Sequence, residues 1–275
     1  MSKFTYEELV AHQNKLEVLF NCNQLMSRMR KEFTESKNPD FVAYMQQHGM
    51  DPKFGIDALV QIALHKRADL PTLLGTLRHH GQTAQEVADG LLWLAQHDFM
   101  HWEPVREMFI VIFEISAEVQ HEIDSYQYPL PMVIEPRHLE NNRQSGYLIS
   151  QGSVILKKNH TEDDVCLDHL NRMNKVALTI NYDTVGMIQN KWKNLDKVQE
   201  GETREDFEKR KRAFDKYNKT AHEVMAVLTH MGNRFYITHK YDKRGRTYAQ
   251  GYHVNYQGTP WNKAVVEFAD AEVIQ

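Results

Sequence analysis

The sequence predicts a mainly α-helical protein with small β elements, and three observations support this. Apolar residues recur at helical spacing through residues 1–125, three prolines interrupt the chain at 126–136, and short apolar runs bounded by glycine follow. A length of 275 residues corresponds to about two domains. We expect a helical N-terminal domain (1–125), then a proline-rich linker, a small hairpin and helices (126–234), and a final strand-and-loop segment (235–275).

The N-terminal helices are predicted from caps and apolar spacing. Thr5 and Glu8 match a capping box ahead of a long amphipathic stretch. The run from Val105 to Val119 is apolar on most faces, which predicts a buried helix. Three further helices are expected to start at Pro39-Asp40, at Leu70-Pro71 and at a second capping box formed by Thr83 and Glu86. Another helix is expected over Ile56–His65, where apolar residues repeat with a helical period.

Beyond the proline-rich break, extended and helical patterns alternate. Gln151-Gly152 supplies turn residues between two apolar runs, and acidic residues after Thr161 suit a helix N-terminus. The expected elements are a β-hairpin at 146–149 and 153–156, helices from about Asp163 to Trp192 and from Thr203 to about Thr229, and extended segments at 235–237 and 247–254 with a turn at Lys240–Gly245.

Composition excludes several classes of protein. Hydrophobic residues make up 41% and charged residues 25%, as in ordinary globular proteins. No stretch approaches the roughly 18 uncharged apolar residues of a membrane-spanning helix, and the first residues lack a secretory signal. Cys22 and Cys166 are too few for a disulfide framework, so we expect buried thiols in a reducing cytoplasm. No glycine-rich nucleotide cradle of the GxGxxG or GxxxxGK[ST] kind occurs.

A metal hydrolase is a weak alternative. His97 and His101 stand four residues apart, a spacing that metal-binding helices use. Asp98 follows the first histidine where the zinc-protease pattern has a glutamate, and no third ligand is evident. We therefore predict no metal site in this chain.

The net charge of −4 conceals a basic segment. Residues 1–186 hold 17 Lys and Arg against 25 Asp and Glu, whereas residues 187–250 hold 15 against 9. Lys209, Arg210, Lys211 and Arg212 follow one another in the second of the long predicted helices. Such a run indicates either a surface for a polyanion or a solvated helix face.

The segment around Gly245 carries the most specific chemistry. Glycine lets a backbone turn tightly or approach a ligand closely. Arg244 and Arg246 flank it, and guanidinium groups bind phosphate through paired hydrogen bonds. Tyr248 offers a ring for stacking, and Asp242 can hold an arginine in place. The pattern indicates nucleic-acid contact, and an ordinary charged hairpin turn is the alternative. The residues predicted to bind here are Asp242, Lys243, Arg244, Gly245, Arg246 and Tyr248.

The stretch Asp242-Lys-Arg-Gly-Arg246-Thr-Tyr248-Ala249 resembles the DxxGR element of the single-subunit DNA-dependent RNA polymerases of phages and mitochondria. Other segments over residues 129–270, about half the chain, are similar to this family in the same order. They are Pro131–Pro136 (its proline-rich element), Gly146-Tyr147 (its Gly-Gly-Tyr), Leu170–Val185 with Asn181 (its thumb helix), Asn255–Gly258 with Gln257 (its Asn-Pro-Gln-Gly) and Lys263–Ala269. Leu139 and Thr179 depart from the pattern, which has a tryptophan and a basic residue there.

The resemblance implies an incomplete polymerase right hand, in which thumb-like helices lie within 126–234 and residues 235–275 complete the palm with a partner chain. It implies the small subunit of a two-polypeptide phage DNA-directed RNA polymerase, a nucleotidyltransferase that is inactive alone. Two-metal phosphoryl transfer needs closely spaced carboxylates, and no matching motif occurs in this sequence. The catalytic residues and Mg²⁺ are therefore expected on the second subunit, which carries palm and fingers.

The implied ligands are the DNA template and the RNA–DNA hybrid, in the cytoplasm of an infected bacterium. Besides the loop, Gln257, Asn181 and the basic run Lys209–Arg212 are expected to contact nucleic acid. A DNA-opening accessory protein is a further candidate partner. The alternative from another class is a free-standing nucleic-acid-binding transcription regulator built on a helical domain.

Overall fold

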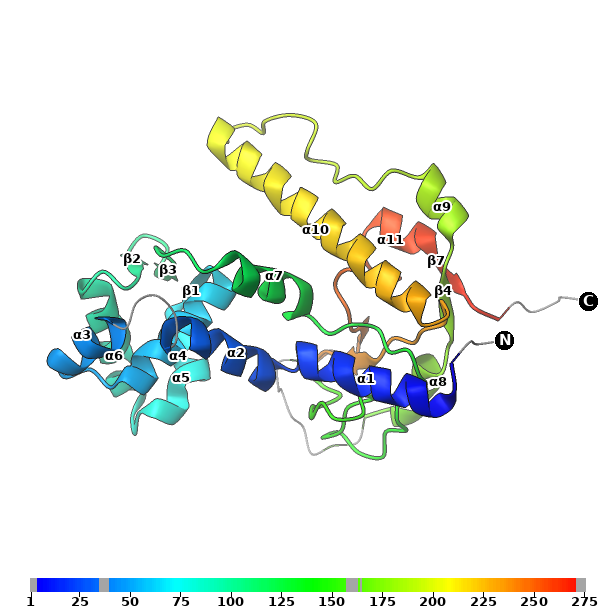
Figure 1. Cartoon of the computed structure of the whole chain (residues 1–275), viewed down its shortest axis with the longest axis horizontal. Coiled ribbons are helices and arrows are strands. Elements are labelled where there is room, and N and C mark those ends of the chain that lie inside the picture. Colours follow the sequence, from blue (N-terminus) through cyan, green and yellow to red (C-terminus); the bar gives the residue numbers. More distant parts are fainter. Residues whose placement is uncertain (1–3, 35–39, 157–162, 164, 271–275) are drawn as a thin grey trace, which may run out of the picture. The chain divides into compact units, whose positions relative to one another are not determined.

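A computed structural model describes residues 4–34, 40–156, 163 and 165–270 (Figure 1). The protein is mainly α-helical with small β-sheets, as predicted. It consists of two compact units: a helical unit, Cys22–Ile123, and a C-terminal unit, which combines Met1–Asn21 with Asp124–Gln275. The first 21 residues thus belong with the C-terminal unit, whereas they were predicted to lie in the N-terminal domain (1–125).

The helical unit is built around one buried helix. All residues of α4 from Phe54 to Ala63 are buried, and Asp51 caps its start by accepting a hydrogen bond from the Lys53 backbone N–H at 3.1 Å. The predicted helices of this region are confirmed at α3, α4, α5 and α6. The unit contains α2 (Cys22–Thr34), α3 (Asp40–Gln47), α4 (Pro52–His65), α5 (Leu70–Leu77), the short 3-10 helix η1 (Arg78–His80), α6 (Ala84–Gln96) and most of α7 (Ala117–Tyr126).

The prediction of a buried helix at Val105–Val119 is wrong. The structure has an antiparallel sheet there, in the order β1 (Arg67–Asp69), β3 (Met108–Ile110), β2 (His101–Glu103). Phe109 at the centre of β3 is fully buried, while Val105 is 91% exposed. A central strand is apolar throughout, so its sequence looks like that of a buried helix.

The C-terminal unit packs its helices around a shared apolar core. Leu16 and Phe20 of α1, Leu228 of α10 and Phe235 are all buried in this core. The predicted capping box at the start of α1 is confirmed, and α10 runs almost as predicted. The elements are α1 (Tyr6–Phe20), α8 (Leu167–Asn174), β4 (Leu178–Ile180), α9 (Tyr182–Met187), α10 (Arg204–His230), β5 (His239–Tyr241), β6 (Thr247–Ala249), α11 (Pro260–Val265) and β7 (Val266–Phe268).

The single long helix predicted from Asp163 to Trp192 is wrong. Strand β4 separates α8 from α9 and pairs antiparallel with β7. Leu178 also forms a backbone bridge with Phe235, where both N–H···O distances lie between 2.8 and 2.9 Å. Pairing with segments far along the chain therefore overrides the local helical pattern.

The β-hairpin predicted at 146–156 is also wrong. The carboxylate of Glu17 accepts hydrogen bonds from the backbone N–H groups of Leu148, Ile149 and Ser150 at 2.7–2.9 Å. These donors bond to a side chain of α1 and are not free to form a strand ladder. Ile155 alone makes a strand-like bridge, to Tyr241.

No helix among the described residues is long and apolar enough to cross a bilayer.

Candidate nucleic-acid interface

The segment around Gly245 forms the tip of a β-hairpin. Strands β5 and β6 pair antiparallel, and Asp242 to Arg246 connect them. The Asp242 N–H donates to the Arg246 carbonyl at 2.9 Å, and the Gly245 N–H donates to the Asp242 carbonyl at 3.0 Å. Gly245 has a φ of +79°, a conformation that residues with a Cβ rarely adopt. The turn predicted here is therefore present, and its backbone conformation favours glycine at this position.

The Asp242 carboxylate organises the tip from inside. Its Oδ1 accepts the backbone N–H groups of Arg244 and Arg246 at 2.9 and 3.0 Å. Its Oδ2 accepts the Arg246 side chain, with Nε at 2.7 Å and Nη2 at 2.6 Å. The backbone N–H of Arg246, followed by its guanidinium, lowers the pKa of Asp242 to about 2. Asp242 is thus charged at any physiological pH and fixes one edge of the Arg246 guanidinium.

The cationic side chains of the tip face solvent. Lys243, Arg244 and Arg246 are all exposed. The Arg246 guanidinium carbon lies 5.6 Å from the centre of the Tyr248 ring, a cation–π distance. A backbone or base could therefore reach two guanidinium groups, one ammonium group and the edge of a ring on one turn.

A cavity of about 380 Å³ lies next to this tip and is lined in part by Tyr241, Lys243 and Gly245. Cys166 also lines it, and the Tyr241 hydroxyl donates to the Cys166 carbonyl at 2.9 Å. Cys166 is exposed, so the prediction of a buried thiol is wrong at this position. The residue precedes α8, where it borders the cavity rather than a core.

The side chain of Gln257 holds strand β6 of the hairpin through two hydrogen bonds. Its side-chain oxygen accepts the Ala249 N–H at 2.9 Å, and its amide nitrogen donates to the Thr247 carbonyl at 3.3 Å. The amide therefore pairs with β6 as another strand would. Asn255 adds a hydrogen bond to the Ala249 carbonyl at 3.2 Å. Gln257 was predicted to contact nucleic acid, and the structure engages both its amide atoms in positioning β6.

Asn181 lies at the start of α9, not within a long helix. Its Oδ1 accepts the Thr184 N–H at 2.9 Å as an N-cap, and its Nδ2 donates to Glu267 of β7 at 2.9 Å. The side chain is tied to its neighbours on both sides, so its evident role is to join α9 to β7.

The four basic residues of α10 divide into two pairs. The Lys209 ammonium forms an ion pair with Glu205 at 2.9 Å. The Arg210 guanidinium donates from Nε and Nη2 to the two carboxylate oxygens of Glu202 at 2.5 and 2.7 Å. Arg210 also donates to the Asn194 carbonyl. The Arg210 guanidinium lowers the pKa of Glu202 to about 2. These two cations therefore fasten the helix to its own first turn and to the segment before it.

Lys211 and Arg212 are exposed, and among the described residues neither has a carboxylate partner. Lys211 borders a cavity of about 220 Å³ that also contains Lys191, Trp192 and Phe214. The Trp192 and Phe214 rings lie 5.3 Å apart at an angle of 63°. Lysines beside aromatic rings can contact a nucleic-acid strand, but Asp196 and Asp215 line the same cavity and make its charge mixed. This cavity was not predicted from the sequence, although a tryptophan between Lys191 and Lys193 was the available signal.

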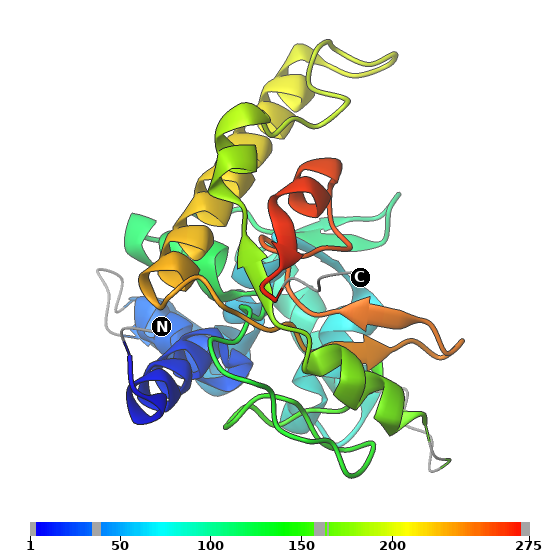
Figure 2. The same ribbon diagram turned by 90° about the vertical axis from the view of Figure 1, so that its right-hand side faces the viewer.

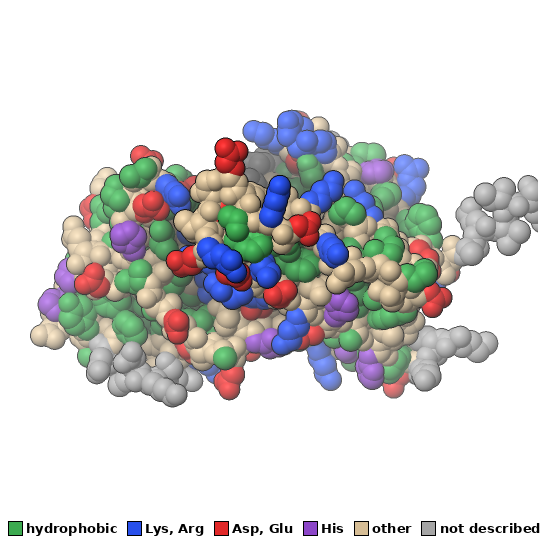
Figure 3. All heavy atoms as spheres, turned by 90° about the horizontal axis from the view of Figure 1, so that it is seen from above, with side chains coloured by type: hydrophobic (Ala, Val, Ile, Leu, Met, Phe, Trp, Pro, Cys, Tyr) green, Lys and Arg blue, Asp and Glu red, His purple; other side chains and the backbone are tan. Residues whose placement is uncertain are grey.

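The structure does not bring the two predicted basic elements together. In Figure 2 the β5–β6 hairpin and the N-terminal half of α10 extend to separate places on the C-terminal unit. Seen from above, Lys and Arg side chains gather on the surface with Asp and Glu side chains among them (Figure 3). The basic residues of the hairpin tip and those of α10 therefore belong to two separate parts of the surface of this unit (Figure 2).

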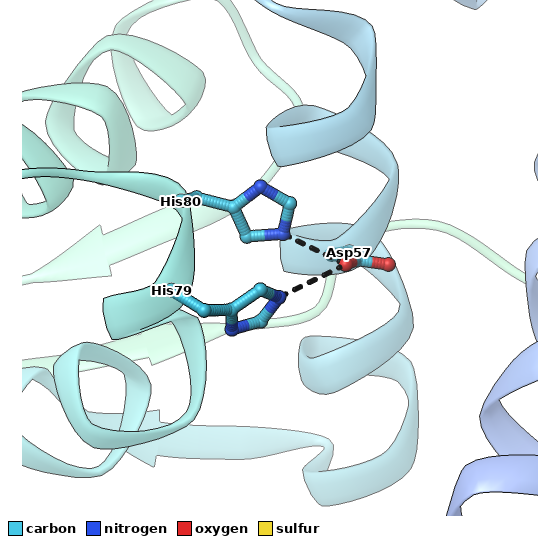
Figure 4. A group of neighbouring side chains, drawn as sticks. All are labelled: Asp57, His79 and His80. Carbon is cyan, nitrogen blue, oxygen red and sulfur yellow. Dashed lines mark hydrogen bonds and ion pairs between the residues drawn. The ribbon is translucent and has the colours of Figure 1, made fainter.

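The His97 and His101 pair does not share a helix face. His97 ends α6 and stacks on Trp93 with ring centres 3.8 Å apart, while His101 begins β2. A different group, Asp57 with the adjacent His79 and His80, brings three possible metal-ligand atoms within 4.8 Å of one another (Figure 4). This group was not predicted from the sequence.

No protein-family model matches this chain, and no curated protein matches it.

Proposed function

We propose that this chain is the small subunit of a two-polypeptide, phage-type DNA-directed RNA polymerase, which grips the template or the RNA–DNA hybrid with the β5–β6 tip. The observation that carries the proposal is the ion pair between Asp242 and Arg246, which presents an exposed, oriented guanidinium on a glycine turn. Guanidinium groups bind phosphate in a defined plane. An oriented arginine would therefore fix the position of a nucleic-acid strand as well as attract its charge.

The packing of the C-terminal unit supports the proposal. Segments on which the resemblance depends lie against the hairpin and against each other, although the sequence separates them. Met132 of the proline-rich stretch exchanges backbone hydrogen bonds of 2.8 Å with Tyr236, which leads into β5. Gln257 holds β6, and β7 pairs with β4. One assembly therefore supports the loop, as a functional clamp requires.

The mechanism assigned to this chain is positional. Arg246 and Arg244 bind phosphates, Tyr248 packs against the strand, and Asp242 with Gly245 sets the geometry of the tip. Holding a strand in line for attack contributes to phosphoryl transfer without any covalent step on this chain. Among the described residues, the donor set that could hold a metal is Asp57, His79 and His80. We assign Mg²⁺ to the partner subunit because the resemblance places the metal-binding aspartates there; the nitrogen-rich set of Asp57, His79 and His80 would suit Mg²⁺ poorly.

A transcription assay tests the proposal. The chain is co-purified with the polypeptide that carries the palm aspartates, and RNA synthesis is measured on a primed template. We expect Arg246→Ala to leave assembly intact and to reduce synthesis and hybrid binding by about tenfold or more, since a hydrogen bond to a charged group contributes about 1.5–3 kcal/mol. Arg106→Ala is the control, because this exposed arginine lies in the helical unit.

Two results would argue for something else. Full synthesis by the Arg246→Ala complex would remove the assigned role of the loop. Tight DNA binding by the chain alone, with no second polypeptide able to join it, would favour a free-standing regulator.

A further inference from the structure

The helical unit holds a converging group of metal-ligand side chains. Asp57 comes from the middle of α4, and His79 and His80 come from η1 (Figure 4). The Nε2 atoms of both imidazoles point at the same carboxylate oxygen, Oδ2 of Asp57, at 3.6 Å from His79 and 2.7 Å from His80. Two imidazoles and a carboxylate thus converge from two elements that α5 separates in the sequence.

We propose that Asp57, His79 and His80 form a binding site for a divalent transition-metal ion of the zinc type. Imidazole nitrogen combined with carboxylate oxygen is a donor set that suits Zn²⁺, Co²⁺ and Ni²⁺, whereas Mg²⁺ and Ca²⁺ prefer oxygen alone. Solvent would complete the coordination, because three protein ligands leave a tetrahedral ion one open position.

The spacing of the donor atoms suits such an ion. Metal–ligand bonds of about 2.0–2.1 Å put neighbouring ligands of a tetrahedral site about 3.3 Å apart. The measured separations from Oδ2, 2.7 and 3.6 Å, bracket that value. All three donor atoms lie within 4.8 Å of one another, so side-chain shifts of about an ångström would bring them to such distances.

Arg30 occupies the other carboxylate oxygen. Its Nε donates to Oδ1 of Asp57 at 2.5 Å and leaves Oδ2 directed at the histidines. Such a partner orients a ligating carboxylate, as groups behind the ligands do in many metal sites. Its positive charge also opposes a cation, so the site should be of moderate affinity.

Exposure gives the ion a route in. The side chains of Asp57 and His80 are 10% and 12% exposed, whereas that of His79 is 62% exposed. The His80 ring meets the edge of Phe54 with centres 5.8 Å apart, which fixes its orientation. Two ligands are therefore held in the fold, and the third faces solvent, where it can close over an arriving ion.

Zinc binding to the purified chain tests the site. Binding is measured by equilibrium dialysis with Zn²⁺, and Co²⁺ absorption reports whether imidazole nitrogen is coordinated. His79→Ala removes an exposed ligand and should leave the fold intact. We expect a saturable site whose affinity falls at least about tenfold in this variant, the lower end of the loss seen even for outer partners. At a fixed Zn²⁺ concentration the Tm of the parent chain should rise more than that of the variant.

The matched control is the double variant His97→Ala/His101→Ala, which removes two histidines that do not converge. It should bind Zn²⁺ like the parent chain. Asp57→Asn, which keeps the shape of the side chain but not its charge, should also lose affinity. If His79→Ala binds as tightly as the parent, or if the control abolishes binding, the site is not here and the three side chains form only an ionic cluster with Arg30.

Discussion

Oδ2 of Asp242 lies 2.7 Å from Nε and 2.6 Å from Nη2 of Arg246, so one carboxylate oxygen holds one edge of the guanidinium. An arginine side chain loses rotamer freedom when it is immobilised on a ligand, and that loss weakens binding. Because Asp242 already orders Arg246, part of the loss occurs during folding. Under the proposed function, the tip of the β5–β6 hairpin would therefore lose less conformational freedom when it binds a phosphate.

Gly245→Ala tests whether the turn geometry matters. The backbone at Gly245 has a φ of +79°, while an added Cβ would meet no atom within 4 Å. The cost is therefore conformational strain alone, and we expect the free energy of unfolding to fall by about 1–2 kcal/mol. Hybrid binding should weaken as well, because Arg244 and Arg246 flank this residue. Urea unfolding and fluorescence anisotropy measure the two effects.

Gly186→Ala is the control for this change. Gly186 lies in α9 with ordinary dihedral angles, and a Cβ there also meets no atom within 4 Å. Alanine favours a helix over glycine by about 1 kcal/mol, so stability should rise slightly and binding should not change. If both variants behave alike, the left-handed turn does not matter to the site.

The exposed cations of α10 should determine part of the salt dependence. Lys211 and Arg212 are exposed without a carboxylate partner among the described residues. If they contact phosphates, each alanine variant should reduce the slope of log K against log salt concentration by about 0.7–0.9. Titrations with hybrid at several salt concentrations measure this slope.

Alanine variants of Arg210 and Lys219 are the controls for those of Lys211 and Arg212. Arg210→Ala should loosen the segment before α10 by freeing Glu202 and should leave the slope as it is. Lys219 pairs with Glu223 further along the same helix, and its alanine variant should have no effect on the slope. Equal slopes for all four variants would mean that α10 is only a solvated helix.

Local signals in the sequence predicted local structure. The capping box of Thr5, the long helix α10 and the turn at Gly245 each depend on residues a few positions apart. The orientation of Arg246 by Asp242 belongs to the same class, since four residues separate them. The core of the proposed nucleic-acid site was therefore predictable.

Long-range pairing accounts for what the sequence did not predict. The strand β4 was read as helix because its partner, β7, lies far along the chain. The hairpin expected at 146–156 does not form, because the carboxylate of Glu17 in α1 accepts the backbone N–H groups that a strand ladder would use. The group of Asp57 and His80 joins residues 23 positions apart, for which no local pattern exists.

Two buried histidines should make the C-terminal unit sensitive to acid. Burial, then the charge of His169, lowers the pKa of His239 to about 4, and burial lowers that of His253 to about 4. Their unfolded pKa is about 6.5, so the unfolded chain binds protons first. Stability is therefore complete above pH 6.5 and falls as the pH drops toward 4, by about 3 kcal/mol for each imidazole.

Urea unfolding at several pH values between 7 and 4 measures this loss. His253 lies among aromatic rings, with Tyr217 5.6 Å away between ring centres, so His253→Phe keeps the packing and cannot be protonated. The variant should lose less stability on acidification than the parent chain. An identical pH dependence would show that His253 does not stay neutral in the fold.

Glu17→Gln tests the assignment of α1 to the C-terminal unit. Glu17 is fully buried, and its oxygens accept the backbone N–H groups of Leu148, Ile149 and Ser150. Gln13 on the same helix accepts the Val133 N–H at 2.9 Å. In glutamine an NH₂ group replaces one acceptor oxygen and would face donors. We expect the free energy of unfolding to fall by about 2–3 kcal/mol, as when a buried hydrogen-bonding group loses its partner.

The location of the loss is as informative as its size. Hydrogen exchange should show faster opening in α10 of the C-terminal unit, while the amides of α4 in the helical unit keep their protection, because separate cooperative units open independently. Glu7→Gln, an exposed change on the same helix, should alter stability by no more than about 0.5 kcal/mol. Loss of protection in α4 rather than in α10 would place α1 with the helical unit.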